Sequence, residues 1–138
     1  MDHTEFLLPM LALIGWTLVI LLGVPIQRFK AAKKRTVTAE DFKYGESLDV
    51  PGEASLANRN FMNLLEVPLL FYVVSIIQFI TNTPISYFLI LSWIFVALRV
   101  IHSFIHLTYN NVIHRMSVFA LSNIALVILW GSLSYSLV

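Results

Sequence analysis

The first long stretch of this chain, residues 6–27, contains no charged side chain. A helix of that length crosses the roughly 30 Å hydrocarbon core of a bilayer. Further apolar stretches follow, and a chain of 138 residues that is 58% hydrophobic lacks the polar surface of a soluble domain. Spanning segments must satisfy their own backbone hydrogen bonds, so each is predicted to be a helix. We predict an all-α, integral membrane four-helix bundle in one domain, with spans at about 6–27, 54–80, 85–110 and 115–137.

The segment between the first two spans, residues 28–53, is the only long polar part of the sequence. It holds six of the nine Lys and Arg residues. The positive-inside rule therefore predicts a cytoplasmic loop with both termini outside, and a surface patch for anionic lipid fits the same placement. Five acidic residues in the same segment argue against a nucleic-acid site.

Two compositional features exclude classes of function or processing. The chain has no cysteine, which rules out disulfides, cysteine-bound metal and catalysis by a protein thiol. Any thiol chemistry would have to use a sulfur carried by a ligand. The first span follows an acidic segment and has no small-residue cleavage site after it, so we expect a retained membrane helix rather than a signal peptide.

The second span carries a stripe of polar residues. Arg59, Asn63 and Glu66 fall within about 60° on one helix face, at 100° per residue. Such residues at membrane depth usually face a partner, a cavity or a ligand. Glu66 is the deepest of the three, and a structural ion pair is the alternative to a functional role for it. Pro68 follows closely and removes one helical hydrogen bond just beyond the stripe.

The third span has a matching stripe of Arg99, His102, His106 and Asn110. Arg99 lies about 16 Å from the Asn110 break, near the middle of the membrane, at 1.5 Å per residue. We predict that it pairs with Glu66, the only carboxylate at that depth. His102 and His106 lack the third ligand of a zinc pattern, so we expect no metal and interpret them as hydrogen-bonding groups in a polar cleft.

Arg115 opens the fourth span. It is either a positive-inside anchor or a cation at the mouth of the cleft that stabilises an anion.

Taken in order, these motifs resemble those of the MAPEG family, the membrane-associated proteins of eicosanoid and glutathione metabolism. The second span matches the family through Arg59-x-x-x-Asn63-x-x-Glu66 followed by Pro68. The third span is similar to the family's Arg-x-x-His/Tyr-x-x-x-Tyr pattern at Arg99, His102 and His106, and Arg115 takes the place of the family's arginine at the start of the fourth helix. Length, spans and the basic loop also agree, so the resemblance covers nearly the whole chain.

The resemblance implies a homotrimer in which glutathione binds between subunits near the cytoplasmic face. Its implied ligand residues are Arg59, Asn63, Glu66, Arg99, His102 and His106, and Arg115 is the implied catalytic residue that stabilises the thiolate. The implied reaction is glutathione transfer to, or glutathione-dependent reduction of, a lipophilic small molecule that enters from the bilayer. The arginines suit this ligand because glutathione carries two carboxylates.

Two departures from the family pattern indicate a divergent member, of bacterial inner-membrane type. His106 stands where many members have tyrosine, and Asn110 and Asn111 make the last inner turn less basic than in eicosanoid-forming members. The leukotriene- and prostaglandin-forming specificities are therefore not supported. The alternative is a non-catalytic membrane protein of this family that binds another anion or a protein partner. A small transporter has less support, because the chain has no internal repeat.

Overall fold

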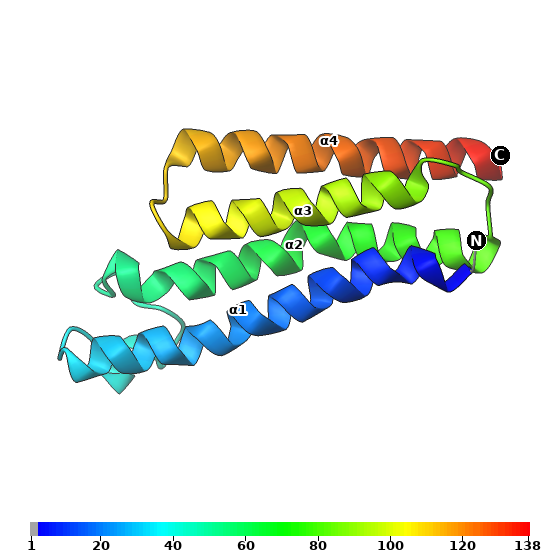
Figure 1. Ribbon diagram of the computed structural model, residues 1–138. Helices are drawn as coiled ribbons and strands as arrows, with labels where there is room; N and C mark the ends of the chain where they lie inside the picture. The colour runs from blue at the N-terminus through cyan, green and yellow to red at the C-terminus, as the bar shows by residue number, and fades with distance from the viewer. Residues whose placement is uncertain (1–2) are drawn as a thin grey trace.

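The computed structural model describes residues 3–138 and consists of four long antiparallel helices with two short 3-10 turns. The helices are α1 (Leu8–Lys33), α2 (Gly52–Thr81), α3 (Phe88–Leu107) and α4 (Val112–Leu137), and the 3-10 turns are η1 (His3–Leu7) and η2 (Ala39–Phe42). All four helices are long and apolar enough to cross a membrane. The predicted all-α class with four apolar spanning helices is thus confirmed (Figure 1).

The helices pack in two close pairs, α1 with α2 and α3 with α4, and α1 and α2 also contact α3. One end of the bundle holds the ends of α1 and α3 and the starts of α2 and α4, as Figure 1 shows. We call it the basic end, because the segment 34–51 and Arg115 lie there. The two described termini and the α2–α3 turn lie together at the opposite end (Figure 1).

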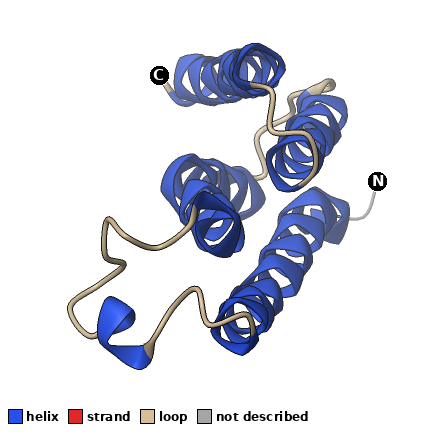
Figure 2. Ribbon diagram, turned by 90° about the vertical axis from the view of Figure 1, so that its left-hand side faces the viewer, coloured by secondary structure: helices blue, strands red, loops and turns tan. Residues whose placement is uncertain are grey.

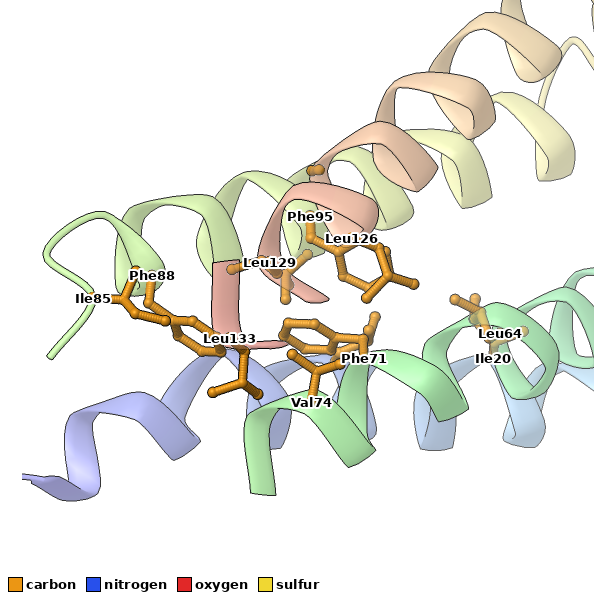
Figure 3. Packing of buried hydrophobic residues seen from close by; sticks show 13 residues of the cluster. Ile20, Leu64, Phe71, Val74, Ile85, Phe88, Phe95, Leu126, Leu129 and Leu133 are labelled. Carbon is orange, nitrogen blue, oxygen red and sulfur yellow. The ribbon is translucent and has the colours of Figure 1, made fainter. Parts of the chain in front are cut away.

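The core is a band of aromatic and aliphatic side chains contributed by all four helices. The rings of Phe71 and Phe95 stack with centroids 4.5 Å apart, and both residues are fully buried. Figure 3 shows Leu126, Leu129 and Leu133 of α4 closing over these rings. Leu13, on α1, is also fully buried in this cluster, so the same core joins both helix pairs.

The first helix is longer than the sequence predicted. α1 continues to Lys33, six residues beyond the expected end at 27, and the loop shrinks to 34–51. Lys30 and Lys33 occupy its last turn, where cations are good helix formers and are favoured by the helix dipole. Arg35 then adopts a left-handed conformation (φ 57°), and the backbone N–H of Thr36 bonds to the carbonyl of Ala31 at 3.1 Å, which ends the helix.

The shortened loop is folded against the basic end rather than extended from it. Its buried members form a small apolar cluster with the two flanking helices, consisting of Ala31, Val37, Val50 and Ala54 with Phe42 packed beside them. The guanidinium of Arg28 lies 4.5 Å from the ring centroid of Phe42. Figure 2, viewed from the basic end, shows η2 beside α1 and α2 and away from α3 and α4.

Candidate functional site

Two adjoining hollows open at the basic end, between α2 and the turn that joins α3 to α4. The larger has a volume of about 350 Å³ and is lined by Leu56, Asn58, Arg59, Met62, Asn63, His106, Asn110 and Arg115. The smaller, of about 140 Å³, is lined by Asn63, His102, Arg115, Met116 and Phe119. They share Asn63 and Arg115, and we refer to them together as the polar cleft.

Helical spacing places the polar side chains of the cleft. Arg59 and Asn63 lie one turn apart on α2, and His102 and His106 lie one turn apart on α3. The two imidazole rings meet edge to face with centroids 6.0 Å apart. Both histidines are almost fully buried, whereas Arg59 is exposed at the opening. The cleft therefore extends from the exposed Arg59 to the buried imidazole rings of His102 and His106.

The turn between α3 and α4 fixes Arg115. Asn110 is in a left-handed conformation (φ 46°), and its backbone N–H bonds to the carbonyl of Ile105 at 2.8 Å. Asn111 caps α4 by accepting a hydrogen bond from the backbone N–H of His114 at 3.1 Å. The side-chain oxygen of Asn110 accepts a hydrogen bond from Nη1 of Arg115 at 2.9 Å. The two asparagines that break the helices thus also orient the guanidinium in the cleft.

The charge of the cleft is positive. Arg59 and Arg115 line it, and no Asp or Glu is among its lining residues. An arginine presents several N–H donors in a planar fork that matches carboxylates. The arrangement therefore favours an anionic ligand.

The predicted ion pair between Glu66 and Arg99 is wrong within the chain. Glu66 is exposed, and the only ion pair among residues 3–138 joins Lys43 to Glu40 at 3.3 Å. The physical reason is helix phase, since at 100° per residue Glu66 lies on the side of α2 opposite the buried residues Leu64 and Phe71. Its carboxylate therefore lies on the exposed outer face of α2, away from Arg99 inside the bundle.

Arg99 is fully buried, and its guanidinium makes its contacts inside the bundle. Its Nη2 donates to the side-chain oxygen of Asn123 on α4 at 2.8 Å. Its guanidinium carbon lies 5.2 Å from the ring centroid of Phe95 and 4.7 Å from that of Phe119. Nε and Nη1 have no hydrogen-bond partner in the part of the chain that the structure describes. Because Phe119 lines the cleft, Arg99 supports the cleft wall from behind instead of facing the opening.

The structure therefore brings together five of the seven residues singled out from the sequence, namely Arg59, Asn63, His102, His106 and Arg115. Sequence reasoning missed the lining residues Leu56, Asn58, Met62, Met116 and Phe119. Helical spacing gave a signal for Phe119, which lies one turn after Arg115 on α4. Among residues 3–138 no group of three potential metal ligands forms around the histidines.

A bundle of four membrane-length helices with a cationic cleft at one end defines an integral, multi-pass membrane protein. Comparison with known families gives one match, in which the sequence model of the MAPEG family aligns with residues 6–135. The chain belongs to the MAPEG family, and the resemblance seen in its motifs is confirmed. No curated protein and no solved structure matches the chain significantly.

Proposed function

We propose that the protein is a membrane-bound, glutathione-dependent transferase or peroxidase that acts on lipophilic electrophiles. The observation that carries this proposal is the polar cleft, in which two arginines, two histidines and Asn63 converge without a carboxylate. Glutathione has two carboxylates for the arginine forks and a thiol that must ionise. Membership of the MAPEG family agrees with a glutathione-related function in a membrane.

Arg115 is our candidate for the catalytic residue. Its bond to Asn110 holds the guanidinium in both hollows, in the first turn of α4. A free thiol with a pKa near 8.5 is mostly protonated at neutral pH, and each unit by which a cation lowers it is worth about 1.4 kcal/mol. The thiolate then forms a bond to an electrophilic carbon of a substrate such as an aryl halide, while the carbon–halogen bond breaks and halide leaves. With a hydroperoxide it attacks the terminal oxygen instead and releases the alcohol, and a second glutathione completes the disulfide and releases water.

The lipophilic co-substrate would reach the cleft from the bilayer. An apolar groove of about 440 Å³ lies between α2 and α4, on the side toward the opposite end of the bundle. Its lining includes Leu70, Val74, Leu126, Trp130 and Leu133. Leu70 and Asn63 lie two turns apart on nearly the same face of α2, so the groove and the cleft follow each other along that face. This favours substrates that combine an apolar body with a reactive group.

We further propose that the chain assembles as a homotrimer in which the cleft lies at a subunit boundary. Glu66 supports this, because a carboxylate on the outer face of a spanning helix is costly in lipid and favoured beside a partner. The surrounding α2 surface is apolar and exposed, with Met62, Leu65 and Leu69 about half accessible. A neighbouring copy would bring Glu66 toward a cation or toward bound glutathione. Native mass spectrometry from detergent measures the assembly, and a monomer at all detergent ratios would refute it.

The basic end is proposed to face the cytoplasm, in a bacterial inner membrane, with both termini outside. Because the chain has no cysteine, the labelling of a single introduced cysteine shows on which side of the membrane that position lies. Tyr44→Cys should resist a membrane-impermeant maleimide in intact cells, and Ser136→Cys should react. The reverse labelling pattern would show that the basic end faces outside, which contradicts the proposed orientation.

The function itself is tested by turnover and binding with the full chain in nanodiscs. Glutathione should bind at or below millimolar concentration, and purified protein should conjugate a generic aryl halide or reduce a lipid hydroperoxide. If glutathione does not bind, the cleft serves another anion or a protein partner, as in the non-catalytic alternative. If it binds but no electrophile or hydroperoxide class turns over, the enzymatic part of the proposal is wrong.

A further inference from the structure

Another hollow at the basic end lies apart from the polar cleft, between the end of α1 and the start of α2. It has a volume of about 360 Å³ and shares no lining residue with the cleft. Its polar lining includes Gln27 and Lys30 of α1, Lys34 directly after that helix, and Glu53 in the first turn of α2. We call it the α1–α2 pocket. The proposed reaction with glutathione does not use it.

The charged side chains of the α1–α2 pocket carry both signs and are not paired with each other. Among residues 3–138, no ion pair includes Lys30, Lys34 or Glu53, and all three are exposed. The amide oxygen of Gln27 accepts a hydrogen bond from the backbone N–H of Ala57 at 2.8 Å, so its amide nitrogen is left to donate to a ligand. The pocket therefore offers two ammonium groups and an amide N–H on one side and a carboxylate on the other.

The depth of the pocket matches the headgroup layer of a bilayer. The uncharged residues 6–27 of the first span account for the roughly 30 Å hydrocarbon core. Lys30 then lies about 5 Å and Lys34 about 10 Å beyond the edge of that core, at 1.5 Å per residue. Lipid headgroups occupy roughly the first 5–8 Å on each side, and a long lysine side chain spans the remaining distance.

Exposed apolar side chains lead from the membrane core to the pocket. Ile26 lies one turn before Lys30 on α1, and Leu22 lies one turn further into the membrane on the same side. Ile26 is 53% exposed and Leu22 is 66% exposed. A lipid whose headgroup occupies the pocket would therefore lay its acyl chains along this apolar surface.

The two signs of charge select among lipid headgroups. Every phospholipid has a phosphate, which suits the lysines and the amide of Gln27. Phosphatidylglycerol carries no cation, so its headgroup would leave Glu53 beside additional negative charge. The trimethylammonium of choline has no N–H to donate. The primary ammonium of ethanolamine has three N–H donors, and a carboxylate accepts them.

We propose that the α1–α2 pocket binds the headgroup of a phosphatidylethanolamine lipid, with its phosphate at Lys30 and Lys34 and its ammonium at Glu53. The bound lipid joins the end of α1 to the start of α2, which the chain itself connects only through the segment 34–51. The inference is independent of the glutathione site, because the two sites have no residue in common.

Native mass spectrometry of the full chain with added phospholipids tests the preference. The probes are phosphatidylethanolamine, phosphatidylcholine and phosphatidylglycerol with identical acyl chains. The unmodified protein should bind the ethanolamine lipid roughly fivefold or more tightly than the choline lipid, because the latter loses a hydrogen bond between charged groups. Soluble phosphoethanolamine at the same concentration should not displace the lipid, since it lacks the acyl chains.

Two sets of variants separate the two ends of the headgroup. Glu53→Gln should reduce the preference for ethanolamine over choline to about twofold or less. Lys30→Gln combined with Lys34→Gln should instead weaken both lipids by a similar factor, because both contain the phosphate. Lys33→Gln is the matched control, since Lys33 is exposed on the same turn of α1 and does not line the pocket.

Glu53 also lies where a carboxylate stabilises the start of a helix through the helix dipole. That structural role would change the thermal stability in Glu53→Gln but not the choice between two lipids. The inference is overturned by equal binding of the ethanolamine and choline lipids, by tighter binding of phosphatidylglycerol, or by a preference that persists in Glu53→Gln. Displacement by soluble phosphoethanolamine would assign the pocket to a soluble ligand instead of a lipid.

Discussion

Arg99 and Arg115 occupy two regions of the α3–α4 pair whose surroundings are opposite. Arg99 is fully buried between the rings of Phe95 and Phe119 and bonds to Asn123. Arg115 is partly exposed, lines both hollows and is oriented by Asn110. The two cations look alike in the sequence, and their positions along the bundle separate them. A cation enclosed by rings becomes part of the packing, whereas one at a helix start remains available to a ligand.

The largest expected effect is on turnover, and it comes from substitution of Arg115 in the cleft. Arg115→Ala should lower glutathione turnover by roughly 10- to 100-fold, because the thiolate loses its nearest proposed cation. Thermal stability in detergent should stay close to that of the unmodified protein, since Arg115 is partly exposed. His114→Ala is the matched control, being the exposed neighbour on the same helix turn that does not line the hollows. Unchanged turnover in Arg115→Ala would end the functional distinction between the two arginines.

Substitutions of the buried Arg99 should change the stability of the protein rather than its turnover. Arg99→Ala should lower the free energy of unfolding by roughly 2–5 kcal/mol, because it opens a cavity between Phe95 and Phe119. Arg99→Met fills the same space without a charge and should cost less than about 1.5 kcal/mol. Unfolding titrations in mixed detergent micelles measure both values.

Turnover of Arg99→Met sharpens the same comparison. It should remain within about threefold of the unmodified protein, since Arg99 acts on the cleft through the ring of Phe119. A turnover loss as large as that of Arg115→Ala, with stability preserved, would mean that Arg99 reaches the ligand after all.

The smallest effect concerns the loop. The backbone N–H of Thr38, at 2.7 Å, and then its hydroxyl hold the pKa of Asp41 below its ordinary value. Because the pKa is lower in the folded state, the stabilisation is fully present above the unfolded pKa and is lost as the pH falls through the folded pKa. The protection of the Thr38 amide, measured as its exchange rate relative to that of an unfolded peptide at the same pH, should therefore be lost only in acid.

The control for the loop prediction is Asp41→Asn. It should abolish the acid dependence of Thr38 protection while leaving glutathione binding at neutral pH unchanged. A protection factor that does not change in acid in the unmodified protein would show that the capping contact is not formed in solution.

Much of the fold follows from the pattern of apolar residues, and less of the site does. Four apolar stretches separated by polar breaks predict the helices because lipid leaves no alternative. The pattern placed helix ends less accurately: the first helix was expected to end at 27 and ends at Lys33, since cations are accepted both in a last helical turn and in a loop. Within the site, helical spacing put Arg59 with Asn63 and His102 with His106 on shared faces.

Helical spacing did not predict which residues face the cleft where this depends on how one helix is rotated against another. Glu66 and Asn63 are one turn apart, and only the packing of α2 shows that Asn63 faces the cleft and Glu66 faces outward. Asn58 has no signal in the sequence, because its partner Glu46 lies in a loop 12 residues away. Contacts between a loop and a helix depend on how the chain folds back, and no periodicity encodes that.

The sequence by itself determined that this chain crosses a membrane as helices, which residues form polar stripes on the second and third helices, and which family it belongs to. Periodicity and hydropathy are local properties, and they carry that information directly. Only the tertiary structure decided which arginine is enclosed by rings and which is open to a ligand. It also replaced the expected Glu66 partner of Arg99 with Asn123. Those outcomes depend on how far each helix is rotated and shifted against its neighbours, which is set by the packing of the whole bundle.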